Sequence, residues 1–104
     1  MNNKFLLFTS GGGSNDPMNW DKDEAVLYSA SSFKGGRPTS SETLELYFEE
    51  GGTVILKIKN NHHVEILSAI GNAIYTSNSG VIPICDVDNN RFINNHIYAC
   101  TIKV

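Results

Sequence analysis

Two neighbouring segments, 43–49 and 53–59, alternate apolar and polar side chains along most of their length. A period of two is expected for β-strands that bury one face, because successive side chains point to opposite sides of a strand. The turn formers Gly51 and Gly52 lie between the segments, so the pattern predicts an antiparallel β-hairpin. The side chains expected on its buried face are Leu44, Leu46, Phe48, Val54, Leu56 and Ile58.

The register of this hairpin can be inferred by matching its faces. A two-residue loop at Gly51-Gly52 would place apolar side chains opposite charged ones, whereas a three-residue loop at 50–52 pairs like with like. Such a loop usually ends in a residue with a left-handed backbone, which predicts that role for Gly52. The expected pairs are Phe48 with Val54, Leu46 with Leu56, Leu44 with Ile58, Glu45 with Lys57 and Tyr47 with Ile55.

One segment changes to a helical period. From about residue 62 to 75 the apolar residues recur at intervals of three and four, which predicts one amphipathic α-helix. Asn60 or Asn61 is expected to cap its first turn, where Glu65 would favour the positive end of the helix dipole. Glycine weakens a helix unless it allows close approach, so Gly71 is expected to touch a sheet.

The rest of the chain is expected to form short strands and loops. Apolar segments predict strands, and a segment with Gly and Pro at 34–41 predicts a loop. The expected fold is mainly β, in the α+β class: an antiparallel sheet, or a small barrel or sandwich, of six to seven strands with one α-helix at about 62–75. At 104 residues, a single domain over 1–104 is expected. The further strands are expected at 5–8, 24–33, 81–87, 92–93 and 96–104.

Charge and hydropathy argue against several classes of protein. Eight basic and eleven acidic side chains give a net charge of -3, which disfavours a nucleic-acid partner because each neutralised phosphate needs a cation. The apolar run at 5–8 is too short for a signal peptide or a spanning helix. Two cysteines are too few for a disulfide-stapled scaffold. We therefore expect no membrane partner, reduced thiols, and a location in the cytoplasm of a host cell or in a virion, without secretion by a signal peptide.

One acidic segment has part of the spacing of a calcium loop. Asp86, Asp88 and Asn90 stand at alternating positions, as the first oxygen ligands of such a loop do. However, Arg91 occupies the position that needs glycine, and Ile97 occupies the position of the bidentate glutamate. An Asx-rich turn is the structure expected there.

Histidine and cysteine do not form a recognisable motif. Adjacent residues of a helix point about 100° apart, so His62 and His63 do not easily face one ion, and no Cys/His cluster follows. Cys85 and Cys100, which share the chain with His96, lie in apolar strand patterns, where a thiol is usually a small buried hydrophobe. The sequence therefore predicts no catalytic residue, no metal ligand and no cofactor, and the protein is expected not to be an enzyme.

The order of the elements resembles a group of viral proteins. The segments that carry the likeness are Thr43-Leu44-Glu45-Leu46-Tyr47-Phe48, the helix from Val64 to Ala73, and Gly80-Val81-Ile82-Pro83-Ile84. In periodicity and order they are similar to short uncharacterised structural-type proteins of marine phage and environmental viral sequences. The resemblance implies a small virion or assembly component, and it assigns no catalytic or binding residue to this chain.

The presence of only one short helix also indicates what kind of partner this protein binds. About 13 helical residues cover only one face of a sheet, so the other face must close into a barrel, meet solvent, or pack against another subunit. In the expected register Tyr47 and Ile55 form an exposed apolar spot, and Trp20 either fills the core from a loop or anchors a subunit contact. We therefore expect a non-enzymatic structural or assembly protein that forms homo-oligomers, such as a phage virion component. The alternative is a small ligand-binding module whose ligand is unknown.

Overall fold

The computed structural model describes residues 4–10, 25–49, 51–76 and 80–103. Within these ranges the chain forms eight β-strands, one α-helix and one 3-10 turn. In chain order the elements are β1 (Phe5–Thr9), β2 (Ala25–Ser29), η2 (Ala30–Ser32), β3 (Phe33–Ser40), β4 (Thr43–Phe48), β5 (Thr53–Ile58), α1 (His63–Thr76), β6 (Val81–Asp86), β7 (Arg91–Phe92) and β8 (Ile97–Lys103).

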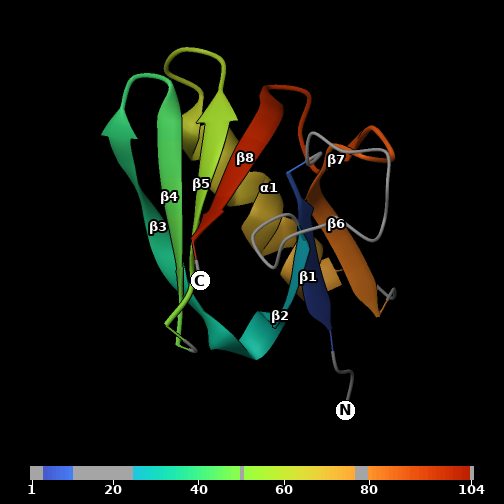
Figure 1. Ribbon diagram of the computed structural model, residues 1–104. Coiled ribbons are helices and arrows are strands. Elements are labelled where there is room, and N and C mark those ends of the chain that lie inside the picture. Colours follow the sequence, from blue (N-terminus) through green and yellow to red (C-terminus); the bar gives the residue numbers. More distant parts are fainter. Residues whose placement is uncertain (1–3, 11–24, 50, 77–79, 104) are drawn as a thin grey trace.

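The strands form two four-stranded sheets, named here the mixed sheet and the antiparallel sheet (Figure 1). The mixed sheet has the order β2-β1-β6-β7, with β1 parallel to β6 and antiparallel to β2. The antiparallel sheet has the order β3-β4-β5-β8. The sheets meet where β8 contacts β1 and β6, and α1 lies behind both sheets, where it contacts β3 and β6 (Figure 1). The expected mainly β, α+β fold is confirmed, and the described strands form no closed barrel.

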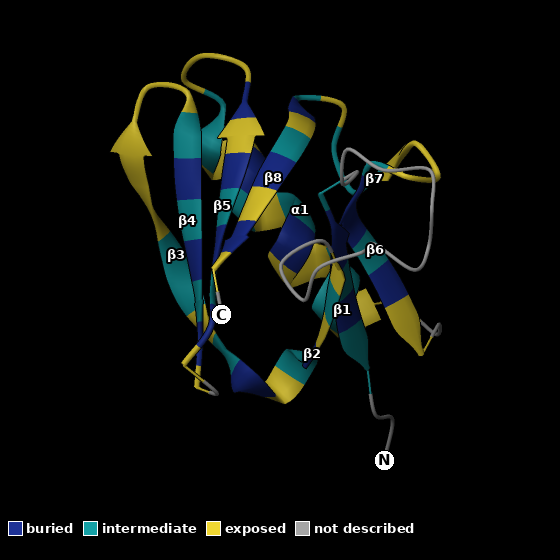
Figure 2. Cartoon of the chain, in the orientation of Figure 1, coloured by how far each residue is buried: buried dark blue, intermediate teal, exposed yellow. Residues whose placement is uncertain are grey.

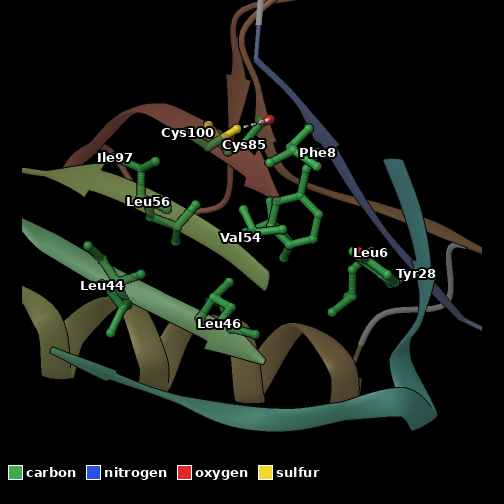
Figure 3. Close-up of a cluster of buried hydrophobic side chains, with 14 of the residues drawn as sticks. Leu6, Phe8, Tyr28, Leu44, Leu46, Val54, Leu56, Cys85, Ile97 and Cys100 are labelled. Atoms are coloured by element: carbon green, nitrogen blue, oxygen red, sulfur yellow. Dashed lines mark hydrogen bonds between the residues drawn. The ribbon is translucent and has the colours of Figure 1, made fainter. Parts of the chain in front are cut away.

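The two sheets and the helix share one hydrophobic core. Buried and more exposed positions alternate along β4, as the period of two predicts (Figure 2). Ile66 and Ile70 of α1 are fully buried in the same cluster as Leu6 of the mixed sheet and Leu46 of the antiparallel sheet. Figure 3 shows Leu6 and Leu46 in this cluster. The inner faces of both sheets are therefore covered within one chain.

The hairpin of β4 and β5 is confirmed, but its predicted register is wrong by two residues. Thr53 lies opposite Tyr47 rather than Glu49, and the Phe48 amide donates to the Gly52 carbonyl oxygen. Gly51 rather than Gly52 has a positive φ, of 91°. A shift of two residues leaves every side chain on its original face, so matching the faces does not distinguish the two registers. The observed pairs are Thr43 with Lys57, Leu44 with Leu56, Glu45 with Ile55, Leu46 with Val54 and Tyr47 with Thr53.

The segment expected to be a loop at 34–41 is instead mostly strand, because β3 extends to Ser40. β3 pairs only with β4, so it is an edge strand, a position where proline such as Pro38 is tolerated. Gly36 allows the close approach of β4, since a β-carbon there would lie 2.8 Å from the carbonyl oxygen of Glu45. The Gly and Pro content of this segment predicted a loop, but β3 pairs with β4 through backbone groups and does not require apolar side chains.

The strand expected over 24–33 is divided into two. β2 ends at Ser29, and η2 turns the chain from the mixed sheet into β3 of the antiparallel sheet. The hydroxyl oxygen of Ser29 accepts a hydrogen bond from the backbone amide of Ser31 at 3.3 Å. This local bond favours the turn over a continued strand, as serine side chains often do.

Helix α1 agrees with the predicted range to within one residue. Glu65 lies in its first turn as expected, but Asn61 has a φ of 62° and forms part of the preceding bend, so it is not in the extended conformation of a cap. His62 directly precedes the helix, and its carbonyl oxygen accepts the amide of Ile66 at 3.2 Å. Gly71 is exposed, with no atom within 4 Å of a β-carbon placed there. Its predicted contact with a sheet is therefore wrong, because the helix packs through its other side.

Candidate functional site

Tyr47 and Ile55, the residues expected at a subunit interface, lie on the outer face of the antiparallel sheet. They are not paired: Tyr47 is opposite Thr53, and Ile55 is opposite Glu45. Both side chains are half-buried, and their neighbours on this face are polar or charged. The two residues are therefore diagonal neighbours on a surface of mixed polarity, which corrects the expected apolar pair. Trp20 lies outside the described residues.

Tyr47 also lines a surface hollow of about 460 Å³, together with Lys34 and Arg37 of β3. The Nε of Arg37 donates a hydrogen bond to the Tyr47 hydroxyl at 3.1 Å, which holds the guanidinium next to the phenol. Within the part of the chain that the structure describes, neither cation has a carboxylate partner within 4.0 Å. Two cations without such a partner beside an aromatic ring are suited to a small anion.

A cluster of outward-facing apolar side chains lies on the mixed sheet. Leu6 and Phe8 of β1 are fully buried, so the residues next to them on the strand point to the opposite side of the sheet. Across the strands, Phe5 is opposite Val81, and Leu7 is opposite both Leu27 and Pro83. The exposed fraction is 48% for Leu27 and 45% for Val81. These five residues, Phe5, Leu7, Leu27, Val81 and Pro83, are named here the apolar outer face.

The sequence contains a signal for this surface. Residues 5–8 and 81–84 are apolar at every position instead of alternating, and strands of that kind are usually covered on both faces. The structure covers the inner side of β1 and β6 with the core and leaves the other side partly exposed. The alternation of the hairpin led instead to the prediction of an interface on the antiparallel sheet, at Tyr47 and Ile55.

Two histidines and a glutamate that are distant in sequence form a compact polar cluster. His62 directly precedes α1, Glu65 lies one turn along the helix, and His96 directly precedes β8. His62 Nδ1 is 2.9 Å from Glu65 Oε1, and His96 Nδ1 is 3.6 Å from Glu65 Oε2. The two imidazole rings stack, with their centroids 3.7 Å apart and an angle of 11° between their planes. One ligand atom from each residue lies within 4.8 Å of the others.

The fold places these three side chains together through backbone contacts. The pairing of β5 with β8 sets Ile58 opposite Ile97, and the Lys59 amide donates to the His96 carbonyl oxygen at 2.8 Å. The side-chain oxygen of Asn94 accepts the His96 amide and lies 2.8 Å from its Nδ1. These bonds fix the start of β8 beside the first turn of the helix.

The charge state of the cluster follows from the same contacts. The hydrogen bond from His62 holds the pKa of the Glu65 carboxyl below its ordinary value, and positive charge on either histidine favours the same form. Glu65 is therefore an anion at neutral pH, facing two imidazoles. The side-chain exposed fractions are 34% for His62, 22% for His96 and 56% for Glu65, so the cluster is open to solutes.

His63, next in sequence to His62, belongs to a different part of the molecule. Its Nε2 lies 2.8 Å from the Ser40 carbonyl oxygen and 3.1 Å from that of Thr43. The expectation that His62 and His63 do not face one site is thus confirmed. The sequence alone does not predict that His96 lies beside His62, because only the pairing of β5 with β8 brings it there.

Both cysteines are buried in the core, as their strand patterns predict. Cys85 and Cys100 have exposed fractions of 0% and 6%, and they lie side by side next to Phe8 (Figure 3). The Cys100 thiol donates to the Thr9 carbonyl oxygen at 3.4 Å. Hydrogen bonding to Cys100 and burial raise the pKa of Cys85, which disfavours its nucleophilic thiolate form.

The segment that resembled a calcium loop forms the predicted Asx-rich turn between β6 and β7. Asp86 is fully buried, and its carboxylate accepts hydrogen bonds from Thr9 Oγ1 at 2.9 Å, Asn89 Nδ2 at 3.0 Å and Arg91 Nη2 at 2.9 Å. The carboxylate that would be the first ligand of a calcium ion is thus bound by protein donors. This network ties the turn to the end of β1.

Comparison with protein-family models, with curated proteins and with solved structures finds no match to this chain. No helix within the described ranges is long and apolar enough to cross a membrane. A functional assignment therefore depends on the surfaces and clusters of the molecule itself.

Proposed function

We propose that this protein is a non-enzymatic structural protein that self-associates through the apolar outer face of the mixed sheet. The observation that carries the proposal is the register of Leu7 between Leu27 and Pro83, with Phe5 opposite Val81. Apolar side chains therefore extend across three neighbouring strands on the side away from the core. A contiguous apolar patch on a soluble domain is typical of an interaction surface.

The chemistry of this face favours a second copy of the same chain as the partner. All five of its side chains are uncharged, so two copies related by a twofold axis meet without repulsion between like charges. An isologous contact requires a surface that complements itself, and a flat apolar sheet face does so more readily than a charged one. The inner faces of the sheets are covered within the chain, so the partner is expected on an outer face.

Light scattering coupled to size-exclusion chromatography tests this proposal. The wild-type protein is expected to elute as a dimer or larger oligomer, and Leu27→Lys as a monomer, because the substitution places a charge within the apolar contact. Thr101→Lys is the matched control, since it adds the same charge at an exposed strand position on the antiparallel sheet. A wild-type protein that stays monomeric at high concentration, or a control that dissociates as readily as Leu27→Lys, would contradict the proposal.

A specific observation also favours a second function, the binding of a small anion. The hollow lined by Lys34, Arg37 and Tyr47 has a volume within the range of small-molecule sites. A ligand with an aromatic ring and a phosphate or carboxylate would stack on Tyr47 and pair with the cations. Phenyl phosphate is a suitable probe in an NMR titration, where wild-type resonances of β3 are expected to shift and those of Arg37→Gln to shift less. Equal shifts in both proteins would exclude this site.

The assignment to a phage virion rests on the sequence resemblance and remains a prediction. Self-association would be compatible with such a role, because virion components are built from repeated copies of a chain.

A further inference from the structure

We infer that His62, Glu65 and His96 form a binding site for one divalent transition-metal ion of the zinc class. The inference is independent of self-association, because the three residues lie at the junction of α1 and β8 rather than on the apolar outer face. It rests on the type, number and convergence of the side chains.

The ligand types match the proposed ion. Imidazole nitrogen and carboxylate oxygen are the donors that zinc and its neighbours in the first transition series prefer in proteins. Two histidines and one glutamate give three protein ligands, the number found in zinc sites that leave a fourth position for water or another oxygen. The side-chain oxygen of Asn94 lies 2.8 Å from His96 Nδ1, in a hydrogen bond that an ion at this nitrogen would replace.

The spacing is close to what an ion requires. Bonds of about 2.0–2.2 Å in a tetrahedral site place neighbouring ligand atoms about 3.4 Å apart. His62 Nδ1 lies 2.9 Å from one oxygen of the Glu65 carboxylate, and His96 Nδ1 lies 3.6 Å from the other. These two distances lie on either side of the required value. An ion bound there would replace the hydrogen bond between His62 and Glu65, and each Nδ1 atom must carry no proton in order to bind it.

The stacked rings specify what must move. An imidazole binds a metal in the plane of its ring, and two parallel rings with centroids 3.7 Å apart cannot both direct a nitrogen at one ion. Binding therefore requires one ring to rotate about its side-chain bonds. His62 is the more exposed of the two, and it lies at the start of the helix, whereas His96 is held by the Asn94 hydrogen bonds. We expect the His62 ring to rotate. His96 would keep its backbone amide bond to Asn94, while its Nδ1 exchanges the hydrogen bond to the Asn94 side-chain oxygen for the ion.

An ion bound at this site would stabilise the folded protein. The three ligands lie near the two ends of the segment that connects β5 to β8. His62 and Glu65 lie soon after β5, at the start of α1, and His96 directly precedes β8, which pairs with β5. A bound ion would cross-link the first turn of the helix to the start of β8. Binding to the folded state alone stabilises a protein, so zinc is expected to raise the melting temperature.

Isothermal titration of the purified protein with zinc chloride tests the inference, with cobalt chloride as a spectroscopic probe. Wild type is expected to bind one ion per chain, and His62→Gln, His96→Gln and Glu65→Gln to bind at least about tenfold more weakly, since even lost outer-shell partners cost about 10- to 100-fold in affinity. His63→Gln is the matched control, because it removes an adjacent histidine whose ring faces the Ser40 and Thr43 carbonyls. It is expected to bind zinc with wild-type affinity.

Two further measurements keep the test decisive. In wild-type protein, NMR is expected to show zinc shifting the ring resonances of His62 and His96 but not those of His63, a readout that does not depend on any variant folding. Leu27→Lys is expected to bind zinc as wild type does, so failure of the self-association proposal can be told apart from failure of this one. Absence of saturable zinc binding in wild type, or a loss of affinity in His63→Gln equal to that in His62→Gln, would overturn the inference.

Discussion

Gly52 lies directly against the phenol ring of Tyr28, so that a β-carbon placed on Gly52 would stand 2.5 Å from Tyr28 Cζ and closer still to its hydroxyl oxygen. Tyr28 belongs to the mixed sheet and Gly52 immediately precedes a strand of the antiparallel sheet. The same phenol ring stacks on Phe48, with ring centroids 4.1 Å apart and an angle of 9° between the planes. This contact joins the two sheets at the end of the hairpin.

Substitution of Gly52 by alanine is therefore expected to lower the free energy of unfolding by about 1–3 kcal/mol, the usual cost of overpacking a core. Urea denaturation measures the change. Gly80→Ala is the control, because a β-carbon at Gly80 meets no atom within 4 Å, and it is expected to change stability little. Equal stabilities of Gly52→Ala and the wild type would show that Tyr28 does not pack against this glycine.

Substitution of Gly71 by alanine is expected to have the opposite effect. Gly71 lies in the interior of α1 with open space around it, and alanine is favoured over glycine in a helix by about 1 kcal/mol. The expected result is a higher free energy of unfolding and a higher melting temperature.

The control for this prediction is Gly35→Ala. Gly35 also has no atom within 4 Å of a β-carbon, but its φ is 119°, a conformation that is strained for any residue with a side chain. Gly35→Ala is expected to destabilise the protein. If both substitutions changed stability in the same direction, helix propensity and backbone strain would not be the controlling factors.

The residues that face the core could be predicted from the sequence, whereas the pairing of strands could not. The alternation in β4 and β5 assigns Leu44 and Leu56 to the buried face in both registers, because a shift of two residues preserves the face. The choice between the registers depends on contacts such as that of Tyr28 with Gly52. Those contacts join segments that are distant in sequence, and a local pattern contains no information about them.

The candidate metal site also could not be predicted from local sequence patterns alone. Residues three apart are neighbours on a helix, so a helix over 62–75 is compatible with the contact of His62 and Glu65, but this contact was not predicted. His96 reaches them only through the pairing of β5 with β8. Strand β3 illustrates a different limit, since its pairing at an edge uses backbone groups and tolerates the Gly and Pro that predicted a loop.

The buried carboxylate of Asp86 is expected to make stability depend on pH in the acid range. Burial raises the pKa of this group, but hydrogen bonds from Asn89, Arg91 and Thr9 outweigh that effect, and its pKa in the folded protein lies below the ordinary value. As the pH falls through that ordinary value, about 3.9, the unfolded chain takes up a proton before the folded chain does. The stability from Asp86 is therefore complete above this pH and is lost as the pH falls towards the folded pKa.

Asp86→Asn isolates this contribution. At pH 7 the variant is expected to be less stable by about 2 kcal/mol, because the buried carboxylate loses its charge-assisted hydrogen bonds from Thr9, Asn89 and Arg91. The difference from wild type is expected to shrink as the pH is lowered below about 4, where the wild-type carboxyl is also becoming neutral. Urea denaturation at a series of pH values measures both free energies. Asp88→Asn is the control, since it removes the same charge from the same turn without altering the Asp86 carboxylate. A stability difference between Asp86→Asn and wild type that stays constant with pH would mean that the hydrogen-bond network does not favour the charged form of Asp86.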